Sequence, residues 1–169
     1  MPADLIEASF KHHAWATARL LGAAESLTEA QLMSPVAHTY GSVLDTLRHI
    51  AGSDSFYLFT LSNDYLEQPD TDAMTLTELS DLAATVAVGW SEYLAISPNP
   101  SGWRRDVDPS MCARDATVGL RLAQALHHGN EHRAHVCTQF SSFGLETPIV
   151  DAWTFGLEQD LSQETYLLP

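Results

Sequence analysis

The chain has 169 residues, of which 45% are hydrophobic, and 22 acidic against 8 basic residues give it a formal net charge of -14. This length and composition predict one globular domain over residues 1–169 that buries a sufficient core without disulfides or a structural metal. The acidic balance and the scattered basic residues exclude nucleic acids and anionic membranes as expected partners, because those surfaces are bound through clustered Lys and Arg.

The first half of the sequence predicts three helices. No basic segment followed by an apolar core opens the chain, so no signal peptide is expected, and apolar residues at helical spacing predict a first helix over 3–25. Thr28 and Gln31 form a capping box for a short second helix, which Pro35 ends. Ser42 is a suitable N-cap for a long helix that runs to about Leu66.

The second half predicts two more long helices and a short one. A capping box at residues 75–78 opens a helix to about Ile96, and a last long helix runs from Thr117 to about Phe143. Residues 98–115 between them read as a long loop, and a loop of this length is either functional or contains a short strand or turn that the sequence does not signal. Asp151 can cap a final helix over 152–161. Four long helices without convincing strand pairs predict an all-α four-helix bundle.

Neither the cysteines nor any apolar segment suggests a disulfide-rich or membrane protein. Cys112 and Cys137 form no C-x-x-C motif and so predict neither a disulfide framework nor a zinc knuckle. No apolar run approaches the roughly 20 residues that cross a bilayer. We therefore expect a soluble, cytoplasmic protein.

The most informative residues are histidines, of which the chain has eight. His128 and His132 lie four apart in the last long helix, so both imidazoles can face one point, as in many helical metal sites. Gly129 stands where a zinc protease carries its catalytic glutamate, so protease chemistry is not expected. This mid-helix glycine indicates either close approach of another helix or room for a metal and its substrate.

A third ligand has to come from another helix, and His49 is the best placed candidate. It lies mid-helix on the flank of an apolar stripe. His135 follows His132 by three residues and can contact this ligand without binding the metal itself. The spacing alone leaves a metal site and ordinary surface or core histidines as equally good interpretations. Four further histidines are less well placed as ligands: His12, His13, His38 and His127. Of these, His127 points away from the pair.

Three stretches resemble the DinB/YfiT-like family. Residues 40–51 resemble the segment that ends in the first metal histidine, here His49. Residues 128–134 resemble the family's H-G-x-x-H-R motif, and residues 143–151 resemble the glycine, proline and aspartate that follow it. The chain departs from the family pattern at His127 and His135, and residues 98–115 match no family motif.

The resemblance implies an up-down four-helix bundle with a long crossing connection and a short C-terminal helix. It also implies homodimers and one divalent metal bound by His49, His128 and His132. Zinc or nickel is the first expectation, and iron, manganese or copper are alternatives, because imidazole suits several of these metals.

By analogy with related families, the resemblance implies a metal-dependent enzyme that acts on a small molecule. The favoured chemistry is that of an S-transferase or isomerase using a low-molecular-weight thiol. Metal-dependent hydrolysis is less favoured, because nothing marks Glu131 as a general base. A non-catalytic metal-binding or stress-related protein is the alternative, and an interaction module without chemistry is disfavoured by the intact histidines.

Three further residues are weighed for the same site. Asp54 can orient a ligand or accept a proton, but a salt bridge on the helix surface is the favoured interpretation. Trp15 and Tyr57 can line a pocket, but ordinary core positions are favoured for both.

Overall fold

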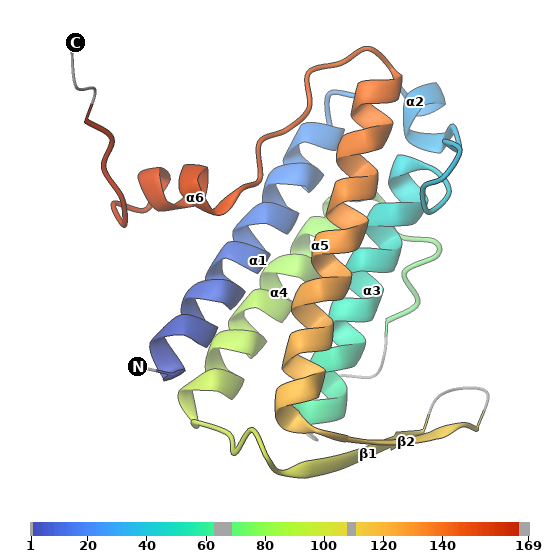
Figure 1. Cartoon of the computed structure of the whole chain (residues 1–169). Coiled ribbons are helices and arrows are strands. Elements are labelled where there is room, and N and C mark those ends of the chain that lie inside the picture. The colour runs from blue at the N-terminus through green and yellow to red at the C-terminus, as the bar shows by residue number, and fades with distance from the viewer. Residues whose placement is uncertain (1, 63–68, 108–110, 166–169) are drawn as a thin grey trace.

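The computed structural model describes residues 2–62, 69–107 and 111–165 (Figure 1). The described elements follow in chain order: α1 (Pro2–Ala24), α2 (Glu29–Met33), α3 (Val43–Ser62), α4 (Leu76–Ala95), β1 (Trp103–Val107), β2 (Ala113–Thr117), α5 (Val118–Ser142) and α6 (Ala152–Glu158). None of these helices is both long and apolar enough to cross a membrane.

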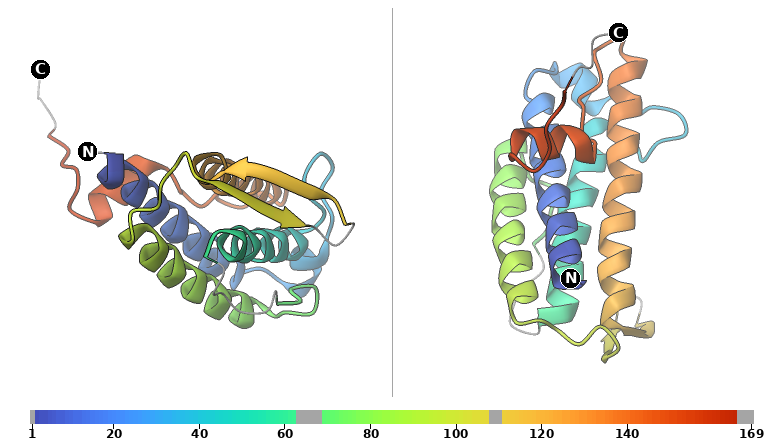
Figure 2. Two further views of the ribbon diagram at one scale, coloured as in Figure 1. Left: turned by 90° about the horizontal axis from the view of Figure 1, so that it is seen from below. Right: turned by 60° about the vertical axis from the view of Figure 1, so that its left-hand side comes forward.

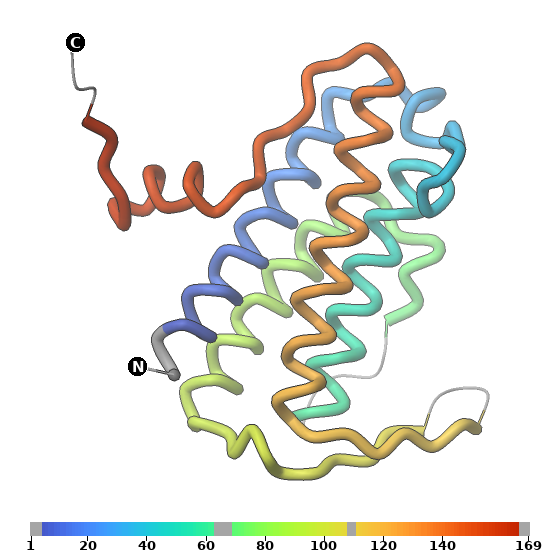
Figure 3. The backbone as a smooth tube through the Cα atoms, in the orientation of Figure 1, coloured from blue at the N-terminus to red at the C-terminus, as the bar shows by residue number. Residues whose placement is uncertain are grey.

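The four long helices form the predicted bundle. Helix α1 packs against α4 and α5, and α3 packs against the same two, so α1 and α3 lie at opposite corners. Figure 1 shows that α1 and α5 run in one direction and α3 and α4 in the other. Since α3 and α4 follow one another yet run parallel, the connection between them has to return along the bundle, and Figure 3 shows its described part, residues 69–75, beside α3. This return is the long crossing connection, and the predicted fold class is confirmed.

The apolar core is divided into two clusters along the bundle axis. One cluster lies toward α2 and includes Leu20, Leu47 and Phe140. The other lies toward the opposite end and includes Phe10 and Leu122. In α1, α3 and α5, polar residues occupy the sequence positions between the two clusters. Most of the functional side chains described below come from this polar layer. They are joined by His49, which lies beside Ile50 of the first cluster, and by Trp90 of the second cluster.

Local capping chemistry sets most of the helix boundaries. The side chain of Thr28 accepts from the Gln31 amide and that of Thr75 from the Glu78 amide, so both predicted capping boxes are present. Asp151 caps α6, which ends at Glu158 rather than at residue 161. The predicted end of the third helix, near Leu66, lies outside the described residues.

The prediction of a long loop over residues 98–115 is wrong. Strands β1 and β2 form an antiparallel hairpin in which Trp103 pairs with Thr117 and Val107 with Ala113. Figure 2 (left) shows the hairpin lying across the ends of α3 and α5. Only Asp106 and Ala116 are buried in the two strands, so the apolar alternation that signals a strand is missing.

The hairpin is anchored to the bundle by a buried arginine and not by an apolar face of its strands. Arg121 of α5 pairs with Asp106 and donates to the carbonyl oxygens of Arg104 and Arg114, each at 3.0 Å. These contacts join both strands to α5. They depend on residues up to 17 positions apart in the sequence, which is why no local pattern indicates them.

Candidate metal centre

Three histidines from two helices converge in the polar layer. His49 comes from α3, and His128 and His132 come from successive turns of α5. One ring nitrogen of each lies within 4.8 Å of the other two, and His49 Nε2 and His128 Nε2 are 3.0 Å apart. Three imidazole nitrogens in so small a space are a donor set that suits a divalent transition metal.

The surroundings keep these imidazoles in the neutral form that binds metals. Burial lowers the pKa of His49. Burial, and then the neighbouring His132 and His49, lower the pKa of His128 to about 4. The pKa of His132 is lowered by burial and by His49. At neutral pH all three rings are therefore uncharged and offer lone pairs without losing a proton first.

An unpartnered nitrogen also fits a ligand role for His132. This residue is 7% exposed, and its Nδ1 is buried without a hydrogen-bond partner among the described residues. The ring of His135 meets the ring of His132 edge-on, with the centroids 5.2 Å apart.

Two tyrosines pack against the histidine cluster. The ring of Tyr40 stacks on His49 at 4.0 Å between centroids and meets His132 edge-on. Tyr57 meets His128 edge-on at 5.5 Å. Tyr57 is partly buried against the second apolar cluster and also lines the pocket beside His49, so it has both of the positions weighed from the sequence.

Hydrogen bonds from side chains of α3 and α5 fix the segment that carries Tyr40. Thr46 Oγ1 donates to the Tyr40 carbonyl oxygen at 2.7 Å, and the buried Gln139 donates from Nε2 to Gly41 O and Thr39 Oγ1. Tyr40 lies in a stretch without regular structure, and nothing in the sequence beyond its place in the family-like segment marks it as part of the site.

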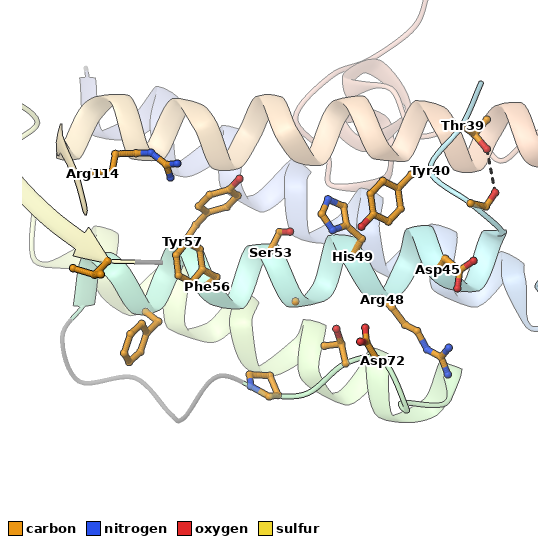
Figure 4. A pocket seen from close by; sticks show the side chains of 16 residues that line it. Thr39, Tyr40, Asp45, Arg48, His49, Ser53, Phe56, Tyr57, Asp72 and Arg114 are labelled. Carbon is orange, nitrogen blue, oxygen red and sulfur yellow. Dashed lines mark hydrogen bonds between the residues drawn. The ribbon is translucent and has the colours of Figure 1, made fainter. Parts of the chain in front are cut away.

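A pocket of about 1400 Å³ opens beside His49 (Figure 4). Its walls come from α3, the segment before α3, the described end of the connection to α4, and both strands of the hairpin. His49 is the one histidine of the cluster that lines it. The cluster is thus reached from a space large enough for a small molecule.

A second polar cluster in the same layer was missed by the sequence reasoning. His13 is 1% exposed, and its Nε2 lies 3.0 Å from Asp54 Oδ2. Trp90 Nε1 donates to Asp54 Oδ1 at 3.1 Å, and Arg133 Nη1 lies 3.1 Å from His13 Nδ1. The four side chains come from α1, α3, α4 and α5, one from each long helix. We refer to His13, Asp54, Trp90 and Arg133 as the four-helix network.

The donors in the network determine which ring nitrogen of His13 carries the proton. A guanidinium can only donate, so His13 Nδ1 accepts from Arg133 and the proton sits on Nε2, which donates to Asp54. Burial lowers the pKa of Arg133 to about 10, which leaves the group charged at neutral pH. A neutral imidazole therefore bridges a buried cation and a carboxylate.

One prediction about these residues is wrong, and it concerns Asp54. His13 lies outside the three-histidine cluster, as expected of a residue less well placed as a ligand, and its buried ring belongs to the network instead. Asp54 was expected to form a surface salt bridge, yet its side chain is 15% exposed and contacts two buried donors. Both depend on helix partners distant in sequence, which no local spacing indicates.

The close approach expected at Gly129 is present. A Cβ atom there would overlap Cε1 of His13 and lie 2.9 Å from Arg133 Nη1. Glycine at this position lets α1 bring His13 against α5.

The other residues considered in the sequence lie away from the cluster. His12 Nε2 lies 2.8 Å from the Val150 carbonyl oxygen, while His38 and His127 are exposed. Trp15 contacts Phe155 and Glu158 of α6 on the outside of α1, so it does not line the pocket beside His49. Figure 2 (right) shows α6 beside α1.

Comparison with known proteins agrees with this architecture. The chain is similar in structure to YfiT from Bacillus subtilis, described as a probable metal-dependent hydrolase with an unusual four-helix bundle topology. The TM-score is 0.61 at 17% sequence identity, with 82% of this chain and 87% of that chain covered. No curated protein matches the chain. The sequence pattern of the DinB family matches residues 1–163, and the chain belongs to the DinB family.

Proposed function

We propose that this protein binds one divalent metal ion through His49, His128 and His132 and acts as a metal-dependent enzyme on a small molecule held in the adjacent pocket. The observation that carries the proposal is the convergence of three neutral imidazoles, one of which lines the pocket. A divalent ion on three imidazoles supplies a Lewis acid with open coordination positions, which lowers the pKa of a bound thiol or water.

The protein's own side chains have separate roles in this proposal. His49 presents the cluster to the pocket, and Tyr40 and Tyr57 pack against the imidazoles and limit their rotation. The four-helix network ties α3 to α5 through α1 and so holds His49 at its distance from the other two histidines.

Transfer or isomerisation that uses a low-molecular-weight thiol is the reaction class we favour. A thiol ionises from a pKa of about 8.5 and water from about 15.7, so hydrolysis depends more strongly on a base that takes the proton from the nucleophile. Both oxygens of Asp54 are occupied by His13 and Trp90, and Asp45 accepts from the Ser42 amide and hydroxyl. Glu131 is exposed and does not line the pocket.

Hydrolysis is the second candidate, and the description of YfiT as a probable metal-dependent hydrolase is the observation that favours it. A metal-binding or stress-related protein without catalysis is the third. The pocket beside His49 argues for a bound small molecule and therefore against this third candidate.

The first experiment measures metal content by mass spectrometry on protein purified without a histidine tag. We expect about one zinc or nickel per chain in the parent, with iron, manganese and copper measured alongside, and loss of the metal in His49→Ala and His132→Ala. His127→Ala, which removes an exposed neighbouring imidazole, is the matched control. A parent that stays free of metal after incubation with zinc and nickel would overturn the proposal.

The second experiment separates the two reactions in the metal-loaded protein. A chromogenic aryl chloride is supplied with a small thiol, so that the sulfur displaces chloride, and a chromogenic ester is supplied without one. Activity with the aryl chloride that depends on both thiol and His132 supports transfer. Activity confined to the ester would favour hydrolysis instead.

A further inference from the structure

One end of the pocket beside His49 combines aromatic side chains with an arginine. We propose that this end binds a carboxylate on a small molecule with an aromatic or apolar body, and that Arg114 is the residue that recognises the carboxylate. The inference rests on the proposed function in taking this pocket as the substrate site. The contact with Arg114 itself does not depend on a bound metal.

The strand register places Arg114 on the inner face of the hairpin. Arg114 pairs across the strands with Asp106, and paired residues share a face of a sheet. Asp106 and Ala116 are the buried residues of that face, which is turned toward the bundle. Arg105 and Asp115 pair with each other on the opposite face. The side chains of Arg114 and Arg105 are similarly exposed, at 60% and 67%, so the two arginines differ in the face they occupy.

Among the described residues, no carboxylate neutralises Arg114 fully. Its Nη1 lies 3.9 Å from Asp106 Oδ2, but Asp106 is already paired with the buried Arg121. Two guanidinium groups thus share one carboxylate and leave one positive charge. In a chain with a net charge of -14, anions are repelled in general, so an uncompensated cation on a pocket wall is a specific feature.

The same end of the pocket provides apolar contacts and a hydroxyl. Phe56, Tyr57 and Phe59 of α3 line it along with Arg114. The Tyr57 hydroxyl accepts from Gln124 Nε2 at 3.2 Å, which leaves its proton available to donate to an anion. Guanidinium and hydroxyl donors beside aromatic rings suit a carboxylate attached to an apolar body.

The opposite end of the pocket is acidic. Asp45 and Asp72 line that end together with Arg48, whose Nε and Nη2 both donate to the Met74 carbonyl oxygen. Figure 4 shows Arg114 at one end, Asp45 and Asp72 toward the other, and His49 between them. A carboxylate is therefore favoured at the hairpin end, which leaves the rest of the molecule near His49.

The test compares two probes of the same shape and different charge, benzoate and neutral benzamide. Each is titrated by NMR into the metal-free and the zinc-loaded protein, in the parent, Arg114→Gln and Arg105→Gln. The two variants lose the same charge from opposite faces of the hairpin. We expect benzoate to bind the parent about tenfold more tightly than benzamide, as one charge-assisted contact provides.

The preference for benzoate should disappear in Arg114→Gln, with benzamide binding unchanged, and should persist in Arg105→Gln. Equal affinity for the two probes in the parent would overturn the proposal, and so would an undiminished preference in Arg114→Gln. A preference present only in the zinc-loaded protein would also overturn it, because the carboxylate would then be bound at the metal. Failure to bind zinc, by contrast, would contradict the proposed function while leaving the metal-free titration decisive.

Discussion

His13 Nε2 of α1 donates to Asp54 Oδ2 of α3 across 3.0 Å in the interior of the bundle. Arg133 extends this contact to α5 and Trp90 extends it to α4, so all four long helices meet at one carboxylate and one imidazole. Two of these helices carry the three histidines of the candidate metal centre. The relative positions of α3 and α5, which set the spacing of the histidines, therefore depend on this network.

Asp54→Asn should destabilise the protein by about 3 kcal/mol, because it leaves the buried Arg133 without a counter-charge and turns an amide donor toward His13 or Trp90. Urea denaturation of the metal-free protein measures the change. Asp81→Asn, the same substitution on the exposed side of α4, should change the free energy of unfolding by less than about 0.5 kcal/mol. Equal stabilities for the two variants would show that the network does not hold the helices together.

Gly129→Ala should destabilise the protein by about 1–3 kcal/mol, because the added methyl group displaces the His13 ring from its place against α5. The matched control is Gly22→Ala in α1, where nothing lies within 4 Å of an added Cβ atom. There alanine should stabilise the helix by up to about 1 kcal/mol. Thermal unfolding followed by circular dichroism compares the two, and opposite signs are expected. A gain of stability in both would contradict the packing described at Gly129.

The metal-free protein should lose stability as the pH falls from about 6.5 to 4. The pKa of His128 is lowered to about 4 in the folded protein from its ordinary value of 6.5, so the unfolded chain binds more protons across this range. The contribution of His128 is therefore fully present above the higher value and is lost as the pH falls through the lower one.

His128→Gln should reduce the slope of unfolding free energy against pH in that range, and urea denaturation between pH 4 and 7.5 measures the slope. His127→Gln removes the adjacent exposed imidazole and serves as the control for loss of a histidine. An unchanged slope in His128→Gln would contradict the burial described for that ring.

Zinc at about one hundred times its dissociation constant should raise the free energy of unfolding by about 2.7 kcal/mol, since the three imidazoles are brought together only in the folded state. His132→Ala should abolish most of this gain. Magnesium, which prefers oxygen ligands, is the control ion and should give none. Equal stabilisation by both ions would point to binding at the acidic surface instead.

The helical part of the fold was readily predicted because its signals are local. The capping boxes at Thr28 and Thr75 and the cap at Asp151 involve residues two or three apart, and each lies where the sequence placed it. The hairpin was missed because a buried arginine in α5 holds it, while its own strands are mostly charged and exposed.

The candidate site also has one part that was predictable from the sequence and one part that was not. The pairing of His128 with His132 followed from helical spacing, and His49 was picked out by its place on an apolar flank and by family resemblance. The network was not foreseen, because Arg133 lies 120 residues from His13, and Asp54 lies 41 residues from it. Side chains this far apart meet only when helices pack.

The sequence by itself determined the number of long helices, most of their ends and the two histidines on α5, because turn-to-turn spacing and capping act within a few residues. Only the tertiary structure decided that His49 meets His128, 79 residues away, that His13 and Asp54 are buried together, and that the hairpin completes a pocket wall. These outcomes depend on which helix faces lie against one another, and that choice is made by packing of the whole chain.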